Sequence, residues 1–588
     1  MNSSKENPSV VSDLACFLTA LVFLLGLLVL AVRLREVQVV DSAAYSYRND
    51  RQSIRRVQTS GERGNILDRR GKPLAINRKS VSIVLNAGAF QRRTWSATIA
   101  AITNEIARAG AVLGRKSPLT ERDISRHVKQ SLAMPLTVWR DVPHVTLARF
   151  LEHEKEFPGF ESVDTEERLY PGGSLAAHLI GYVGRDNADS DAGDTKYNFR
   201  IPELRGRSGI EAYYDQYLRG VSGESRLRVD ARGFATEKWT VEDSRRGPDL
   251  KLTIDRDLQR EAEKQLEGRK GACVAIDPNN GEVLCFASAP AFNLNDFVPR
   301  LGEEVYLKYS TDPAKPLLNR ASGGAYAPGS TFKPITALAG LSLGFPASEP
   351  YYCSGVYELG RMKLHCARRW GHGDLDMRHA LRESCNPYFC NLGVDIGTNA
   401  LIKAARVFGL GAKTGLDLAV DMAGTVPDAE WKKRMYGEKW FQGDLAQMSI
   451  GQGMLLVSPL QMARVAAAIG TGCLVTPHLR LGLETEKKKL PFTAAQLQVV
   501  RDGMRMVVDG GTGRKGGENV PVAVSGKTGT AEIGKGETRR KNTWFIAYAP
   551  SDKPRIAVAM VIENGDSGGG TTAPKVAAVL RSFFLNER

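Results

Sequence analysis

An uncharged run of 19 residues near the amino terminus, from Leu14 to Val32, most limits how this 588-residue chain can fold. A helix of that length, rich in Leu and Val, matches the hydrocarbon thickness of a bilayer. The flank that follows, Arg33-Leu34-Arg35, lacks the small-x-small cleavage pattern of a signal peptide. The sequence therefore predicts a retained transmembrane helix at residues 14–32.

The charges around this run leave its orientation open. Only Lys5 precedes the run, whereas Arg33 and Arg35 follow it, so basic-residue counting does not favour export of the body. Long domains, however, are translocated largely regardless of flanking charge. We expect a cytoplasmic tail at residues 1–13 and a body outside the cytoplasm, an expectation that depends on the function inferred below.

The composition indicates a folded protein with an anionic partner. A chain of this length exceeds one core, so two or three domains are expected. The net charge of +15 suits lipid headgroups, a pyrophosphate-bearing substrate or an acidic polymer. Nucleic acid is not expected as a partner, because the chain has no Cys/His finger, no RNP-type motif and no long basic run.

Two regions follow the hydrophobic run. Residues 33–245 are polar, and helical patterning at about 90–160 indicates an inserted head. Residues 246–588 carry strand patterns at both ends and helical patterns between them, which predicts an α+β fold with an antiparallel sheet flanked by helices. The expected strands are Leu250–Asp255, a hairpin of Ala272–Asp277 with Glu282–Ser288, Thr543–Ala549 and Arg555–Ile562.

Ser330 is followed three positions later by Lys333, and on a helix this spacing places both side chains on one face. A partly desolvated lysine amine can take the proton of a serine hydroxyl and so make it an acyl-transfer nucleophile. Alone, this pair is more often two surface residues of a helix.

Two further motifs lie downstream. They are Ser384-Cys385-Asn386, after a helical stretch, and Lys527-Thr528-Gly529-Thr530, after the strand-like Pro521–Ser525. A second Lys-Thr-Gly at Lys413 lies at a helix end with no strand to aim the lysine, so we choose Lys527. Ser-x-x-Lys, Ser-x-Asn and Lys-Thr-Gly in this order resemble the penicilloyl serine transferases, which include penicillin-binding proteins and class A β-lactamases.

The resemblance implies a role for each motif residue. Ser330 would be the nucleophile and Lys333 its base, and Ser384 would bridge Lys333 and Lys527 and carry a proton to the leaving amine. Asn386 would hold Lys333 or a substrate amide. Lys527 and Thr528 would bind a substrate carboxylate, Gly529 would let substrate lie along the strand edge, and the N–H groups of Ser330 and Thr530 would form the oxyanion hole.

Over nearly its whole length the chain resembles class B penicillin-binding proteins, which implies a pedestal or dimerisation-type domain at 33–245 and a transpeptidase domain at 246–588 with a five-stranded antiparallel sheet. The penicillin-binding protein 2 group, which acts in cell elongation, is the most similar on the basis of Trp370-Gly371-His372-Gly373 and the segment Trp431–Trp440. The division-specific group is the nearest rival. The motifs that carry the class resemblance are Arg63-Gly64-x-Ile66-x-Asp68-Arg69-x-Gly71, Arg168-x-Tyr170-Pro171, Gly209-Ile210-Glu211, Leu252-Thr253-Ile254-Asp255 and Ser449-Ile450-Gly451-Gln452-Gly453.

The resemblance implies a DD-transpeptidase that cross-links peptidoglycan stem peptides, binds β-lactams covalently and needs no cofactor for its chemistry. It also implies an inner-membrane protein with a periplasmic catalytic domain, and a separate SEDS-family glycan polymerase as partner. A carboxypeptidase, a β-lactamase and a β-lactam sensor or inactive scaffold are the alternatives, although the intact motifs argue against a scaffold and the anchor argues against a free hydrolase.

Cys353, Cys366, His372 and Cys385 form a candidate metal site near the second motif. Three thiols and an imidazole suit tetrahedral zinc, which here would be structural. Similar positions in penicillin-binding protein 2 relatives look like metal ligands. A Cys353–Cys366 disulfide and free buried thiols remain open as alternatives.

Overall fold

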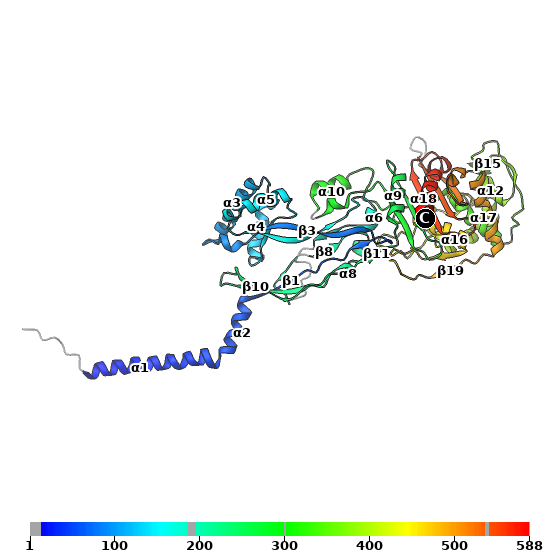
Figure 1. The fold of residues 1–588 in the computed structure, drawn as a ribbon. Helices are drawn as coiled ribbons and strands as arrows, with labels where there is room; N and C mark the ends of the chain where they lie inside the picture. Colours follow the sequence, from blue (N-terminus) through cyan, green and yellow to red (C-terminus); the bar gives the residue numbers. More distant parts are fainter. Residues whose placement is uncertain (1–12, 186–195, 202, 299–300, 535–539, 587–588) are drawn as a thin grey trace, which may run out of the picture.

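The amino-terminal helix α1, Asp13–Arg35, projects from one end of an elongated molecule, and the carboxy-terminal domain forms the other end (Figure 1). The structure is a computed structural model that describes residues 13–185, 196–201, 203–298, 301–534 and 540–586. Apart from Asp13, the expected cytoplasmic tail lies outside these residues.

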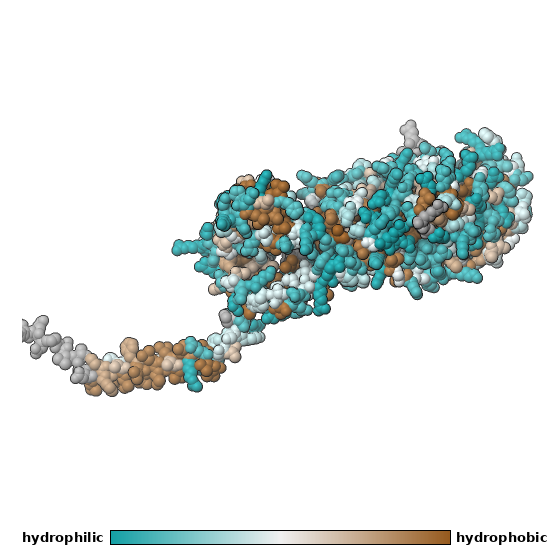
Figure 2. Space-filling model, in the orientation of Figure 1, coloured by the Kyte–Doolittle hydropathy of each residue, from teal (hydrophilic) through white to brown (hydrophobic). Residues whose placement is uncertain are grey.

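Helix α1 is apolar and exposed along its length, in contrast to the largely hydrophilic body (Figure 2). It is long enough and apolar enough to cross a bilayer, and its side chains have no protein core to pack against. A short π-helical turn, Glu36–Val40, and helix α2, Ser42–Ser53, connect it to the body.

The region after α2 is built on two sheets. One has the strand order β10-β9-β1-β7, and the other the order β11-β2-β3-β4, with β5 also paired to β3. A separate pair, β6 and β8, lies beside short helices α6–α8. The bounds are β1 Ile54–Thr59, β2 Ile66–Leu67, β3 Pro73–Leu85, β4 Leu136–Trp139, β5 Phe160–Leu169, β6 Val183–Arg185, β7 Phe199–Arg200, β8 Leu204–Gly206, β9 Gly223–Val229, β10 Ala235–Glu242, α6 Ala177–Ile180, α7 Gly209–Tyr213 and α8 Asp215–Leu218.

Glu211 connects three of the motif segments of this region. Its carboxylate accepts from Nε of Arg63 at 2.7 Å and from Nε of Arg168 at 2.8 Å, and all three side chains are buried. Each arginine belongs to a different motif, so one carboxylate holds three segments together. A buried charge is tolerable here because it is paired on both oxygens.

Three helices gather at the end of long strands β3 and β5 nearest the anchor (Figure 1). They are α3 Trp95–Leu113, α4 Glu121–Gln130 and α5 His144–Glu152. Their apolar faces share a core with Trp139 and Phe160, separate from the main core of the protein. These helices form the head that the sequence patterning indicates at about 90–160.

The carboxy-terminal domain contains a five-stranded antiparallel sheet in the order β13-β12-β22-β21-β20, as expected. Strand β22 shows why the sheet is buried on both faces. Val558 and Met560 face the core shared with helices α9 and α18, whereas Ala559 and Val561 face the core shared with α11 and α16. The bounds are β12 Gly271–Ile276, β13 Val283–Ala289, β20 Ser525–Ile533, β21 Arg540–Ala549, β22 Ile556–Glu563, α9 Arg256–Gln265, α11 Lys333–Ser342, α16 Pro459–Thr471 and α18 Ala573–Asn586.

Two expected strands are wrong in extent. Only Leu250–Lys251 of Leu250–Asp255 forms a strand, β11, because the next N–H groups, of Leu252 and Thr253, donate to different segments and no ladder continues. The strand expected at Pro521–Ser525 begins at Ser525 and runs to Ile533, so the Lys-Thr-Gly motif lies inside the strand.

Helices and short strands fill the middle of the domain. The strands between 351 and 375 have no counterpart in the sequence-based expectation, which gave this stretch to helix. The bounds are α10 Glu303–Ser310, β14 Tyr351–Cys353, β15 Val356–Leu359, β16 Met362–His365, β17 Gly373–Leu375, α12 Met377–Glu383, α13 Asn386–Val407, α14 Ala429–Tyr436, α15 Gln442–Ser449, β18 Cys473–Val475, β19 Lys487–Lys489 and α17 Ala494–Asp509.

Candidate active site

Ser330 lies in a single 3-10 turn, Gly329–Phe332, and Lys333 is the first residue of α11. Ser330 thus lies in the turn that leads into the helix, and residues three apart share a face in a 3-10 turn as they do on an α-helix. Ser330 is half-buried, and within the described part of the chain its hydroxyl has no hydrogen-bond partner.

Close backbone packing fixes the turn that carries Ser330. Gly329, at φ +55°, donates its N–H to the carbonyl of Gly451 at 2.8 Å. A Cβ on Gly451 would lie 2.0 Å from the Gly329 oxygen, and a Cβ on Gly329 would lie 2.8 Å from the oxygen of Thr530. Glycine is thus required at both positions, and the turn is pressed against strand β20.

The Lys333 amine is fully buried and donates to three oxygens of the second motif. These are the carbonyl of Ser384 at 2.6 Å, the amide oxygen of Asn386 at 2.7 Å and the hydroxyl of Ser384 at 3.3 Å. Burial lowers the pKa of Lys333 to about 8, because a low-dielectric surrounding disfavours the ammonium form.

Ser384 stands between the two motif lysines. It follows α12 in the left-handed conformation, at φ 55° and ψ 41°, which is strained for a residue with a Cβ. This geometry aims its hydroxyl at the Nζ atoms of Lys527, at 2.8 Å, and Lys333, at 3.3 Å. Burial and the charge of Lys333 lower the pKa of Lys527 well below its ordinary value. The protonation of one amine therefore disfavours protonation of the other, and the Ser384 hydroxyl lies between them.

Lys527 to Thr530 lie on β20, the edge strand of the sheet. Thr530 points its carbonyl away from the sheet, where it accepts from Nε2 of Gln452 at 3.2 Å. Because the N–H and C=O of a residue in an antiparallel ladder face the same side, the N–H of Thr530 also points outward, as an oxyanion donor requires.

The other Lys-Thr-Gly sequence has a structural role. Thr414 and Gly415 donate to the carboxylate of Asp421, from the hydroxyl at 3.0 Å and the N–H at 2.9 Å. The segment is a loop between α13 and α14, without a strand.

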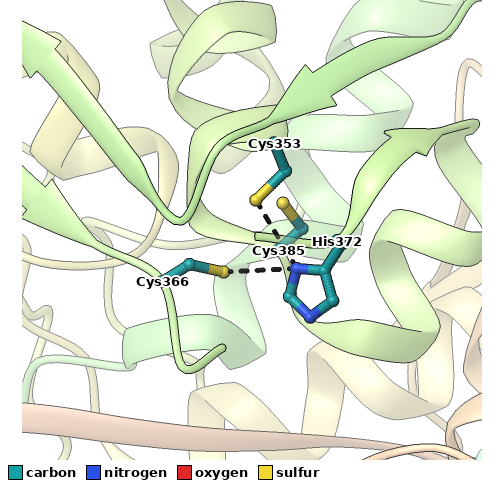
Figure 3. A group of neighbouring side chains, drawn as sticks. All are labelled: Cys353, Cys366, His372 and Cys385. Carbon is teal, nitrogen blue, oxygen red and sulfur yellow. Dashed lines mark hydrogen bonds between the residues drawn. The ribbon is translucent and has the colours of Figure 1, made fainter. Parts of the chain in front are cut away.

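The four candidate metal ligands converge in one group (Figure 3). Nδ1 of His372 lies 3.5 Å from Sγ of Cys353 and 3.6 Å from Sγ of Cys366, and all four ligand atoms lie within 4.8 Å of one another. The three thiols are buried and none is in a disulfide. A hydrogen bond from Cys385 lowers the pKa of the Cys366 thiol, so a thiolate forms readily here.

This group adjoins the second motif. Cys385 lies between Ser384 and Asn386 in the chain, and the amide of Asn386 donates to the carbonyl of His365 at 2.8 Å. The residues of the Ser-x-Asn motif are therefore held by the same lobe, β14–β17, that supplies Cys353, Cys366 and His372. Sequence reasoning placed these ligands but did not identify the strands that bring them together.

The fold and the three converging motifs define a serine acyl-transfer enzyme of the penicillin-binding class. The family model described as "Penicillin binding protein transpeptidase domain" matches residues 271–581, and that described as "Penicillin-binding Protein dimerisation domain" matches residues 58–252.

Comparison with individual relatives shows which group of this class the chain resembles. The peptidoglycan D,D-transpeptidase MrdA of Escherichia coli K12 is 31% identical, over 96% of this chain and 93% of that protein. The solved complex of PBP2 and MreC from Helicobacter pylori matches with a TM-score of 0.79 and 28% identity, over 91% of this chain and 99% of that chain. A solved peptidoglycan synthase complex, described as coordinating polymerization and crosslinking, matches with a TM-score of 0.72 and 29% identity. The match covers 97% of this chain and 98% of that chain. The chain belongs to the class B penicillin-binding protein 2 family of peptidoglycan D,D-transpeptidases.

Proposed function

We propose that this chain cross-links the stem peptides of nascent peptidoglycan during cell elongation, through an acyl ester on Ser330. The observation that carries the proposal is the Ser384 hydroxyl between two buried lysine amines, beside the turn that holds Ser330. Such a group can move a proton without histidine.

In the acylation step, Ser330 Oγ attacks the carbonyl carbon of the penultimate D-Ala of a donor stem, and its proton passes to neutral Lys333. The developing oxyanion accepts from the N–H groups of Ser330 and Thr530, each such donor being worth about 3 kcal/mol. The C–N bond to the terminal D-Ala then breaks, and the departing nitrogen gains a proton through Ser384. Lys527 and Thr528 hold the carboxylate of that D-Ala.

In the second step, an amine of a neighbouring stem attacks the ester carbon along the open edge of β20. The new C–N bond forms, the C–Oγ bond breaks, and Ser330 regains its proton. Asn386 keeps Lys333 in place through both steps by accepting from its amine. Gly529 lets the turn that carries Ser330 pack closely on β20, because a Cβ there would lie 2.8 Å from the Pro328 oxygen.

The proposal includes an extracytoplasmic location. Helix α1 would anchor the protein in the cytoplasmic membrane, with the body on the periplasmic side where donor stems are found. The partner would be a SEDS-family glycan polymerase, in line with the relative solved as part of a peptidoglycan synthase complex. β-Lactams would acylate Ser330 and block cross-linking.

Covalent labelling by a fluorescent penicillin tests the nucleophile. We expect one label per wild-type chain, slow loss of label, and none on Ser330→Ala. Label that persists on the alanine variant would refute the assignment of Ser330. Turnover of the label within seconds would favour a β-lactamase.

We further propose that Cys353, Cys366, His372 and Cys385 hold a structural zinc ion. Their donor set suits tetrahedral zinc, and zinc bound by such a set contributes directly to folding stability. The ion would take no part in the acyl transfer; it would stiffen the lobe that supports Ser384 and Asn386.

Elemental analysis of protein purified without chelator tests this site. We expect about one zinc per chain, a loss of zinc in Cys366→Ser, and a thermal midpoint lowered in the same variant. Cys473→Ser is the matched control, since Cys473 lies outside the group, and it should keep its zinc. Less than a tenth of an equivalent in the wild type would exclude the site.

A further inference from the structure

Thr512 lies beside the third motif, and neither the motifs nor the acyl-transfer scheme assign it a role. It belongs to the run Gly510-Gly511-Thr512-Gly513 between α17 and β20. Its hydroxyl lies 2.8 Å from the hydroxyl of Thr528, the residue after Lys527. Thr512 is exposed, whereas Thr528 is buried, so the pair presents one hydroxyl to solvent.

The backbone of Thr512 is fixed by the segments around it. Its N–H donates to the carbonyl of Arg382 at 3.4 Å, and Arg382 lies two residues before Ser384. A Cβ on Gly569 would lie 2.2 Å from the Thr512 oxygen, so the π-helical turn Gly568–Thr572 after β22 packs tightly against it. Thr512 is therefore held between the helix that carries the second motif and the strand that carries the third.

The two hydroxyls favour a ligand that only accepts hydrogen bonds. Each hydroxyl has one proton, and the bond between them uses one of the two. The other proton has only a long bond, from the Thr512 hydroxyl to the carbonyl of Arg382 at 3.5 Å. An anionic acceptor can replace that bond, because charge-assisted bonds are the stronger ones. The amine of Lys527 donates to the carbonyl of Thr528 at 3.1 Å, so a further hydrogen-bond donor lies nearby.

We infer that Thr512 is a substrate-binding residue that, together with Thr528, receives the terminal carboxylate of the donor peptide and thereby selects acids over neutral analogues. This inference rests on the proposed function and deepens it, because it adds a binding residue from outside the three motifs.

The test compares benzylpenicillin with its methyl ester, which lacks the carboxylate, as acylating agents of the full chain in detergent. We expect Thr512→Val to lower the second-order acylation rate with the acid about tenfold, because one hydrogen bond to a charged group is lost. The rate with the ester should change less than twofold. Thr512→Ser, which keeps a hydroxyl, should restore the rate with the acid. Thr236→Val, an exposed threonine on β10, is the matched control and should leave both rates unchanged.

The outcomes separate this inference from the proposed function. An equal loss of rate with acid and ester would mean that Thr512 only supports the local structure. No change of rate with the acid would mean that Thr512 does not contact the carboxylate. Either result overturns the inference, while the labelling of Ser330 still stands. Absence of acylation in the wild type would overturn the proposed function itself.

Discussion

Ser384→Ala removes the single hydroxyl that connects the two buried lysines. Lys527 would keep only one of its two hydrogen-bond acceptors, the carbonyl of Thr528 at 3.1 Å, and Lys333 would keep two of three. Loss of a hydrogen bond to a charged group costs about 1.5–3 kcal/mol, but a buried lysine can lose its proton instead, so we expect a stability loss near the lower value.

The kinetic loss should be far larger than the loss of stability. Without the hydroxyl, a proton can no longer pass from Lys333 to the leaving amine, and a positioned acid–base group contributes about 10²–10⁴-fold to rate. We therefore expect the penicillin acylation rate of Ser384→Ala to fall by at least about 10², while the thermal midpoint falls by only about 2 °C.

Time courses of fluorescent penicillin labelling, read beside thermal melts of the same samples, measure both quantities. Ser525→Ala is the matched control: Ser525 is buried on the same strand as Lys527, and its hydroxyl donates to Ser551 rather than to a lysine. It should lose stability without a comparable loss of rate. Acylation of Ser384→Ala within threefold of wild type would refute the proton path through this residue.

Two further predictions concern other parts of the molecule. Gly451→Ala should abolish penicillin labelling, because its Cβ would lie 2.0 Å from the oxygen of Gly329; Gly437→Ala, at a similar φ but with no atom near the added carbon, should retain it. Burial raises the pKa of Glu263 to about 7, so the folded state favours the protonated carboxyl. The stability that this preference contributes is therefore full below pH 4.5 and is lost as the pH rises through 7. Glu263→Gln should therefore melt with the wild type at pH 4.5 and at a higher temperature than the wild type at pH 8.

The convergence of the candidate catalytic residues could be predicted from sequence, because each belongs to a short motif with a spacing typical of acyl-transfer chemistry. Ser330 and Lys333 are one turn apart, and the structure brings Ser384, Asn386 and Lys527 to Lys333 as the order of the motifs implies. The antiparallel sheet was also predictable, since strands such as β12 and β22 are long enough to show apolar patterning.

The residues that position these groups could not be predicted in the same way. The lobe β14–β17 consists of strands of three and four residues, which are too short for a periodic signal. Gly451 acts through the close approach of its backbone to Gly329, and Thr512 through the hydroxyl pair that it forms with Thr528. Both contacts join segments that are distant in the sequence. The glycines at 510, 511 and 513 signal a tight turn, but a turn signal does not identify the partner that the turn approaches.

Residues outside the three motifs affect the chemistry through the conformation of Ser384. Ser384 occupies a strained backbone conformation, and such strain persists only where the surrounding structure imposes it. Two segments do so: Cys385 is packed into the thiol group, and Asn386 is bonded to the carbonyl of His365. Loss of the thiol group should therefore let Ser384 relax and disconnect the two lysines, while the face of the sheet that packs on α9 and α18, whose core contains no residue of that lobe, stays folded. In this enzyme the candidate metal site would support catalysis through the conformation of one serine, without contact with the reacting atoms.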